Sequence, residues 1–463
     1  MIPTYKIYSM KTFIMSALLL AITILTLPVS SQSNLISGNV NLKFPGTAIT
    51  FSGFGYGEGP GVIDDASGNV LLFTNGYQLF NSVGISVGIV GTATCLSACQ
   101  GGIILPLPGS SNLYYIFTVE GWGGNGVGLS YSVWNITTNT FSVPRTTLNI
   151  NCLEQLTSTC DNAGGYWILS HETGVGGGTN NHYVAYHLTS AGLNLTPVQS
   201  AGIMEYPTPP AYNRYGTIIV SPDGKQICNA FGGAPIVDST TVEIANFNNI
   251  TGAITSVKTL QTNISVNPNK VLDRAYSSAF SSNNKVLYIG SVFSIATPAA
   301  IKQFDISSGI INTIINSRID IPNALSPNPP MTLTLAPNNK IYGTQGLSSS
   351  TIFKITSPNT VGTGCNFIAN AFPSNFYQTG GIFSQVPPTQ CNSCDCGNWA
   401  DNFTYVSDDI SFNLACNDTI TSILPGSTIS FTSLIYNCLG DSTCTGLVNW
   451  TLTGPNSASG GHF

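Results

Sequence analysis

Short runs of alternating apolar and polar residues fill most of the chain. Each run enters a turn of Pro, Asp, Asn or Gly and leaves as a second such run, which is the pattern of a β-hairpin. A clear copy is TIIVSPDGKQIC at residues 217–228. Five further copies, three of them more diverged, lie at residues 62–73, 104–117, 164–169, 280–288 and 335–342. No segment after the N-terminus has helical periodicity with caps over three turns. The pattern therefore predicts an all-β protein.

The spacing of these hairpins indicates a repeat. From Asp65 the successive turns at Gly109, Gly164, Asp223, Asn283 and Asn338 follow at steps of 44, 55, 59, 60 and 55 residues. Further strands follow five of the hairpins, at residues 131–134, 184–188, 242–247, 301–305 and 352–355. A period of about 50 residues is typical of four-stranded propeller blades, which bury their faces by packing radially. We predict a six- or seven-bladed β-propeller over residues 40–386. A tandem of β-sandwiches is the alternative.

The pattern changes near Pro387. Residues 387–400 are expected to form a cysteine-rich linker. Beyond it, residues 410–414, 427–432 and 447–452 alternate as exposed sandwich strands do, and Trp450 resembles the core tryptophan of Ig-like modules. These strands are too few to bury two faces. We therefore expect residues 401–463 to be a partial Ig-like or PKD-like β-sandwich, continued in a longer parent chain or docked elsewhere.

The N-terminus has the features of a secretory signal. Lys6 and Lys11 precede an apolar run over residues 13–27, and small residues follow before Gln32. The run is shorter than the roughly 20 residues that a spanning helix needs, so a membrane anchor is the less favoured alternative. We predict a signal peptide over residues 1–31, with Met10 as an alternative initiator. The mature chain would be secreted or held at the cell surface without a transmembrane anchor.

Charge narrows the range of partners. Charged residues make up 7% of the chain, and removing Lys6 and Lys11 with the signal changes the formal net charge from −6 to −8. No basic residues cluster, so nucleic acid is not expected as a partner. Cell-surface proteins or glycans are expected instead.

Twelve cysteines in an exported chain suggest disulfides. Local pairing is predicted for Cys95 with Cys99 and for Cys152 with Cys160. A C-terminal group also has the spacing of disulfide candidates: Cys391, Cys394, Cys396, Cys416, Cys438 and Cys444. Zinc at the C-x-x-C motif is the less favoured interpretation, because no histidine lies nearby. Cys228 and Cys365 are left over, either free or joined across the fold.

Candidate chemistry is sparse. His171, Glu172 and His182 could hold a metal or share a proton, but a solvated loop is the preferred interpretation. Asp64 and Asp65 carry oxygens that suit Ca²⁺, although they equally suit a hairpin turn. Trp122 lies in a glycine-rich loop and could stack on a ligand, while packing over the propeller is the preferred alternative. We predict no catalytic residues and, Ca²⁺ aside, no cofactor.

Several segments resemble a known family. They are residues 57–59 (GEG), 64–76 (DDASGNVLLFTNG), 105–109 (LPLPG), 114–118 (YYIFT), 166–167 (YW), 221–225 (SPDGK), 340–342 (KIY) and 358–366 (PNTVGTGCN). In this order they resemble the N-terminal propeller of large Bacteroidetes surface proteins linked to gliding motility and type IX secretion. The resemblance covers roughly residues 40 to 385 and implies a propeller followed by Ig-like or PKD-like repeats. It implies no catalytic residues.

Two functions follow as hypotheses. The first is a non-enzymatic module for adhesion, display, or protein or glycan binding at the cell surface. The alternative is an extracellular propeller-fold hydrolase or lyase acting on polysaccharide, which would need carboxylates or a His/Tyr pair converging at the central channel.

Overall fold

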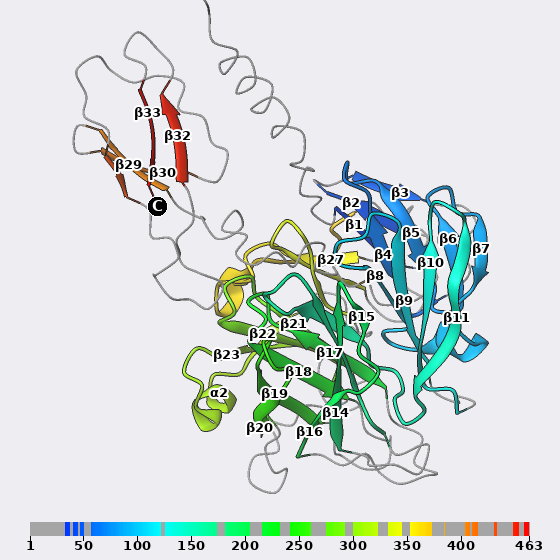
Figure 1. Ribbon diagram of the computed structural model, residues 1–463. Helices are drawn as coiled ribbons and strands as arrows, with labels where there is room; N and C mark the ends of the chain where they lie inside the picture. Colours follow the sequence, from blue (N-terminus) through cyan, green and yellow to red (C-terminus); the bar gives the residue numbers. More distant parts are fainter. Residues whose placement is uncertain are drawn as a thin grey trace, which may run out of the picture.

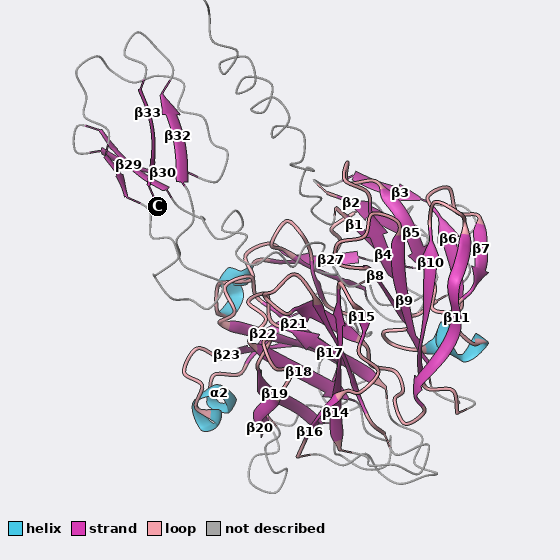
Figure 2. Cartoon of the chain, viewed as in Figure 1, coloured by secondary structure: helices cyan, strands magenta, loops and turns pink. Residues whose placement is uncertain are grey.

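The computed structural model describes the body of the chain with several gaps. The described residues are 33–37, 40–44, 47–50, 57–121, 126–173, 181–203, 215–231, 241–260, 275–291, 300–322, 332–344, 352–372, 384 and five strands within 403–462. The predicted signal peptide lies outside them. Among these residues the helices are short: α2 (Ile311–Asn316) and the 3-10 turns η1 (Ala93–Ser97) and η3 (Gly362–Cys365) (Figure 2). The prediction of an all-β protein is confirmed. In the described segments, no helix has the length and apolar character needed to cross a bilayer.

Seven antiparallel sheets form the body (Figure 1). The first has three strands: β1 (Asn34–Ser37), β2 (Val40–Lys43) and β3 (Thr47–Thr50). Six sheets then follow in chain order: β4 (Gly61–Asp64), β5 (Val70–Thr74), β6 (Gln78–Asn81) and β7 (Ser86–Ile89); β8 (Gly102–Pro106), β9 (Leu113–Val119), β10 (Leu129–Asn135) and β11 (Thr140–Asn149); β12 (Thr157–Cys160), β13 (Tyr166–His171), β14 (His182–Thr189), β15 (Gly192–Leu193) and β16 (Val198–Ala201); β17 (Gly216–Val220), β18 (Gln226–Phe231), β19 (Thr241–Phe247) and β20 (Ile254–Thr259); β21 (Ala275–Phe280), β22 (Val286–Ser291), β23 (Ala300–Asp305) and β24 (Ile319–Pro322); β25 (Thr334–Leu335), β26 (Ile341–Thr344), β27 (Ile352–Ile355) and β28 (Phe367–Ile368). Each is a meander, apart from β16, which pairs with β14.

The six predicted hairpins are confirmed as the turns between the first and second strands of these six sheets. Their turn residues explain why. Asn284 and Asn339 have φ values of 60° and 58°, in the left-handed region that asparagine tolerates better than most residues. Gly68 and Gly224 occupy the same region at 73° and 69°. The predicted third strands are confirmed as β10, β14, β19, β23 and β27.

The core is divided into apolar clusters that lie between neighbouring sheets. One such cluster joins β8–β11 to β12–β16 through Phe117 and Ile168, and equivalent clusters join each later sheet to the next. Leu35 of β1 packs with Tyr342 of β26, so the last of the six sheets contacts the first of the chain. Ile36 of β1 packs with Phe73 of β5, and β4–β7 in turn packs on β8–β11. The sheets therefore follow one another in a propeller-like arrangement.

Ser384, distant in sequence, forms two hydrogen bonds with β1. Ser384 is buried and donates its backbone N–H to the carbonyl oxygen of Ile36 at 2.7 Å, and its Oγ accepts from the Ile36 N–H at 2.9 Å. Ser384 thus lies beside β1.

Two further small sheets lie in the C-terminal part. They are formed by β29 (Phe403–Ser407), β30 (Ile410–Leu414) and β31 (Ser430–Thr432), and by β32 (Val448–Leu452) and β33 (Ala458–His462). The side chain of Trp450 and the predicted linker at residues 387–400 lie outside the described part of the chain.

Candidate functional site

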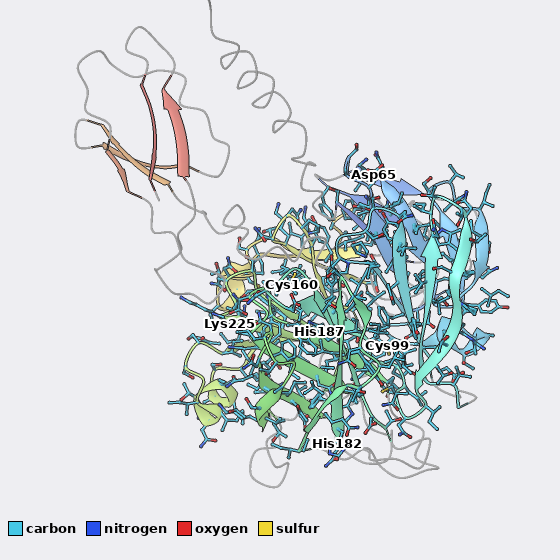
Figure 3. All side chains as sticks on the ribbon, viewed as in Figure 1. Asp65, Cys99, Cys160, His182, His187 and Lys225 are labelled. Carbon is cyan, nitrogen blue, oxygen red and sulfur yellow. The ribbon has the colours of Figure 1, made fainter. Side chains whose placement is uncertain are left out.

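The body has two ends with different chemistry. We call the end that carries the six hairpin turns between first and second strands the turn face. We call the opposite end, where first strands begin and second strands end, the loop face. In Figure 3, Asp65, Cys160, His187 and Lys225 belong to the turn face, and Cys99 and His182 to the loop face.

Gln100 ties three sheets together at the loop face. It lies just before β8, and its Oε1 accepts from the N–H of Ile218 in β17 at 2.8 Å and from the N–H of Leu156, just before β12, at 3.2 Å. Its Nε2 donates to the Ile218 carbonyl at 2.8 Å. Because β8 and β17 belong to sheets that are not adjacent in the chain order, this amide spans the middle of the arrangement. The Gln100 side chain is buried.

Two carboxyl groups and a thiol lie beside Gln100. Glu154 accepts the Cys99 N–H at its Oε2 at 2.8 Å. Its backbone has a φ of 67° and is held by its N–H donating to Glu120 O and its carbonyl accepting from Gln100 N. Glu58 is buried, and none of the hydrogen bonds among the described residues uses its carboxyl group. Burial first, and the charge of Glu154 second, raise the pKa of Glu58 well above its usual value.

The same causes act on the thiol. Burial, followed by the charges of Glu154 and Glu58, raises the pKa of Cys99 well above its ordinary range. A thiol with a raised pKa is a poor nucleophile at neutral pH. The arrangement favours proton retention on Glu58 and does not activate Cys99.

The other loop-face carboxylates are engaged with backbone and hydroxyl donors. Glu120 accepts from Thr92 and Thr94 at one oxygen and from the N–H groups of Val127 and Gly128 at the other. Glu243 accepts from the Ile203 N–H at 2.9 Å and from the Tyr183 hydroxyl. Both carboxylates therefore pair backbone N–H groups beyond the ends of strands, and of these the Gly128 N–H is buried.

An amide relay extends this network. Gln155 donates to Asn229 Oδ1 at 2.5 Å, and Asn229 donates to the Tyr183 hydroxyl at 3.3 Å. The three residues are buried and link β12–β16 to β17–β20. These hydrogen bonds favour a single arrangement of the two sheets, because a buried polar group without its partner raises the free energy of the folded state.

The predicted histidine and glutamate group does not converge on one point. His171 and Glu172 are consecutive, and His171 ends β13, where successive side chains point to opposite faces. His171 is buried edge-on against Tyr183, and burial lowers its pKa to about 3. Glu172 accepts from Asn149 at 2.9 Å and lies 3.7 Å from His182. Contrary to the prediction of a solvated loop, His171 and Glu172 are buried.

Asp64 and Asp65 have different roles. Asp65 is exposed and accepts from the N–H groups of Ser67 and Asn69 at 2.8 and 2.9 Å, which confirms the predicted turn. Asp64 accepts from Ser33 N and Asn34 N at 2.6 and 3.1 Å and so links β4 to the start of β1. Burial raises the pKa of Asp64. Neither role requires Ca²⁺, and no group of three or more potential metal ligands occurs among the described side chains.

The predicted local disulfides are not formed. Cys95, Cys99, Cys152, Cys228 and Cys365 are buried free thiols. Cys99 Sγ instead accepts from Gly216 N at 3.2 Å, and Cys95 Sγ accepts from Thr92 N at 3.4 Å. Cys152 precedes β12 and bridges to Glu172 beyond the end of β13, whereas Cys160 pairs with Tyr166 at the start of β13, so the length of this hairpin places the two thiols beyond disulfide reach.

Cys160 itself is disulfide-bonded. Its partner is none of the five described cysteines, because those are free. The side chains of the remaining candidates lie outside the described residues: Cys391, Cys394, Cys396, Cys416, Cys438 and Cys444. Trp122 also lies outside the described part, so its stacking role stays a prediction.

Sequence reasoning missed the most connected residues. Gln100 has no motif, and its role depends on sheets that are distant in the chain. His187 and Asp161 form a pair at 2.8 Å on the turn face, and His187 stacks on Trp167 with ring centroids 4.1 Å apart. The only available signal was the turn chemistry of Asp161, which accepts from Ala163 N and Gly165 N.

Comparison with known proteins gives no family assignment. No family model and no curated protein matches this chain. Among solved structures, the chain is similar to a periplasmic gluconolactonase of Pseudomonas aeruginosa, with 14% identity, TM-score 0.38, and 60% of this chain and 69% of that chain covered. It is also similar to a streptogramin B lyase, with 14% identity, TM-score 0.38, and 75% and 91% covered. A third is the GH74 enzyme of Niastella koreensis, with 14% identity, TM-score 0.39, and 66% and 45% covered. At these TM-scores the likenesses assign neither blade number nor activity to this chain.

Proposed function

We propose that the chain is an exported, non-enzymatic propeller module that binds proteins or glycans at the cell surface. This proposal rests on the hydrogen bonds that the loop-face carboxylates accept. Glu120, Glu154 and Glu243 accept from backbone N–H groups of segments that connect strands, and of these the Cys99 N–H on Glu154 is buried. Groups engaged in this way hold loops in place and are not available as acids or bases. The relationship to gliding-associated surface proteins belongs to the same proposal.

A binding survey tests this function. The purified chain is applied to a glycan array and, in parallel, used to capture partners from an envelope extract. Saturable binding in either experiment supports the proposal, and an absence of binding in both contradicts it.

One observation favours a second function. Glu58 is the loop-face carboxyl group whose pKa is raised and whose oxygens have no hydrogen bond among the described residues. A carboxyl group that keeps its proton beside a second carboxyl group is the arrangement of a general acid, as in polysaccharide hydrolases and lyases. Cleavage of a polysaccharide that disappears in Glu58→Gln would support this alternative, since glutamine keeps the shape but cannot transfer the proton.

We further infer that the propeller has seven blades closed by the chain near Ser384. Seven apolar clusters join seven sheets in a cycle within the described residues. The first sheet has three strands, and Ser384 bonds to the free side of β1.

Truncation tests the closure. A chain ending at Phe372 should unfold without cooperativity or lose at least about 3 kcal/mol of stability, because it exposes β1 and its backbone groups. A chain ending at Pro387 keeps Ser384 and serves as the control. Equal stability of the two chains in urea would contradict closure by this segment.

We also propose that residues 401–463 belong to an Ig-like or PKD-like domain. The strand pairing of β29 with β30 and of β32 with β33 fits this assignment. Limited proteolysis should cleave the 463-residue chain beyond residue 387 and leave the propeller intact. A monodisperse sample with an uncut tail would show that these strands are already a finished structure.

A further inference from the structure

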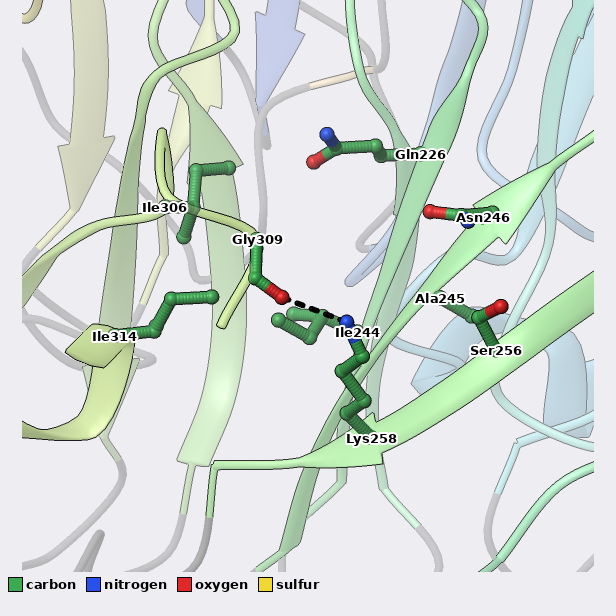
Figure 4. Close-up of a pocket in the computed structure, with 9 residues that line it drawn as sticks. All are labelled: Gln226, Ile244, Ala245, Asn246, Ser256, Lys258, Ile306, Gly309 and Ile314. Carbon is green, nitrogen blue, oxygen red and sulfur yellow. Dashed lines mark hydrogen bonds between the residues drawn. The ribbon is translucent and has the colours of Figure 1, made fainter. Parts of the chain in front are cut away.

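A polar cleft lies at the rim between two sheets, outside the loop-face network. It is formed by β18, β19 and β20 on one side and by the connection from β23 to α2 on the other (Figure 4). It is a surface depression that opens to solvent. The apolar cluster between the two sheets ends here, and the next side chains on the same face of the β17–β20 sheet are polar.

Two amide side chains line the cleft together. Gln226 of β18 and Asn246 of β19 are directly opposite each other in the strand register. Their Cβ atoms are therefore separated by roughly 5 Å and point to the same side. None of the hydrogen bonds among the described residues involves either side-chain amide. Each amide presents donors and an acceptor, a combination that suits adjacent hydroxyl groups of a ligand.

A β-bulge shapes the adjoining wall. Ile244 pairs with Lys258 and Asn246 pairs with Thr255, so that Ser256 and Val257 together oppose Ala245. Ser256 has a φ of 53°, which is uncommon for a residue other than glycine. Bulges re-aim side chains and occur beside binding sites. Here the bulge brings the Ser256 hydroxyl and the Lys258 side chain to the same cleft.

The Lys258 ammonium is positioned and still has donors to offer. Its Nζ donates to the Gly309 carbonyl at 2.7 Å, which holds the lysine across the cleft (Figure 4). An ammonium group has three donors, so two remain for a ligand. Ile306 and Ile314 form an apolar wall opposite the amides. The site thus combines one cation, two amides, one hydroxyl and an aliphatic surface.

We propose that this cleft binds a carboxylate-bearing sugar unit, the uronate residue of an acidic polysaccharide. Vicinal hydroxyls would pair with Gln226 and Asn246, the carboxylate with Lys258, and the C–H face of the ring with Ile306 and Ile314. A phosphate ligand would call for a cluster of cationic donors, whereas the site holds a single ammonium group. This inference rests on the proposed binding function and names its ligand class and place.

Titration calorimetry on the full chain tests the site with oligogalacturonate and with the same oligosaccharide after chemical reduction of its carboxyl groups. The wild type should prefer the acidic form by about tenfold, the size expected for one charge-assisted hydrogen bond. Lys258→Gln should abolish that preference, and Lys258→Arg should retain it. Asn246→Ala should weaken binding of both forms.

Lys225→Gln is the matched control, because Lys225 precedes Gln226 but does not line the cleft. It should bind as the wild type does, and thermal melts check that each variant is folded. Equal binding by Lys258→Gln and the wild type overturns the proposed cleft. If the array shows neutral glycans or proteins as ligands and no acidic sugar, the uronate assignment fails while the proposed function stands. If nothing binds in any format, the proposed function itself fails.

Discussion

The turn face and the loop face differ in how their backbone N–H groups find side-chain hydrogen-bond partners. At the turn face, short side chains pair with the backbone of their own turn: Asp65 with Asn69, Ser221 with Gln226, and Ser281 with Val286. At the loop face, Glu154, Gln100 and Glu243 reach backbone groups that are 40 or more residues away. Local pairing gives each turn its own conformation, to which bonds between turns such as Asp223 N to Asn284 Oδ1 at 3.2 Å are added. The loop-face groups Glu154, Gln100 and Glu243 are held mainly through distant partners. We therefore expect substitutions at the loop face to lower the free energy of unfolding more than substitutions at the turn face.

The largest effect is expected at Glu154. Glu154→Ala removes the acceptor for Cys99 N and leaves a buried N–H without a partner, so the free energy of unfolding should fall by about 3 kcal/mol. Glu154→Gln keeps an acceptor oxygen and should cost clearly less. Urea denaturation measures both. Equal losses in the two variants would show that charge, and not backbone pairing, is the role of Glu154.

The next effect concerns pH. The pKa of Glu58 is raised on folding, so the folded state holds its proton more tightly than the unfolded state, whose value is near 4.5. The contribution of Glu58 to the free energy of unfolding is therefore fully present below pH 4.5. It falls as the pH rises toward the pKa of the folded state, by up to about 1.4 kcal/mol per pH unit, because the unfolded state then loses its proton first.

Glu58→Gln should remove this slope. Urea denaturation midpoints are measured between pH 4 and 8 for the variant and the wild type. Their difference gives the contribution of Glu58, because His171 contributes equally to both proteins. Parallel curves would show that the pKa of Glu58 is unchanged by folding, and would weaken the contrast between the faces.

A smaller effect is expected at Asp161, the most connected residue of the turn face. Asp161→Ala loses two backbone partners and His187, and should cost about 2 kcal/mol. His187→Gln removes the ring stacking on Trp167 but leaves the Asp161 turn, and should cost less. A loss larger than that of Glu154→Ala would reverse the proposed order of the two faces.

The smallest effect is expected at Asp65. Its turn is exposed and its partners lie within four residues, so Asp65→Ala should lower stability by about 0.5 kcal/mol. Thermal unfolding with Asp65→Asn as the control measures this, since asparagine keeps the oxygen acceptor. A loss above about 2 kcal/mol would be unexpected for a self-contained turn.

The same contrast explains what the sequence could predict. Turns such as residues 221–226 and 281–286 are encoded within six residues, so the hairpins and the third strands were predictable. The interior of the loop face was not, because Gln100 meets Ile218 through a fold that no local pattern specifies. The predicted pairing of Cys152 with Cys160 was wrong for a related reason: the two are close in sequence, but they lie at opposite ends of the β12–β13 hairpin. Local chemistry predicted the turns, and long-range contacts decided the candidate site.

Binding without turnover is the central claim, and one measurement tests it most directly. The full chain is incubated with the glycan that it binds most tightly on the array, and the glycan is then analysed by mass spectrometry alongside a sample incubated with Glu58→Gln. If the protein binds without turnover, the glycan mass is unchanged in both samples and the two proteins bind with equal affinity. Shortened or unsaturated products from the wild type, absent with Glu58→Gln, would contradict it and establish Glu58 as a catalytic acid.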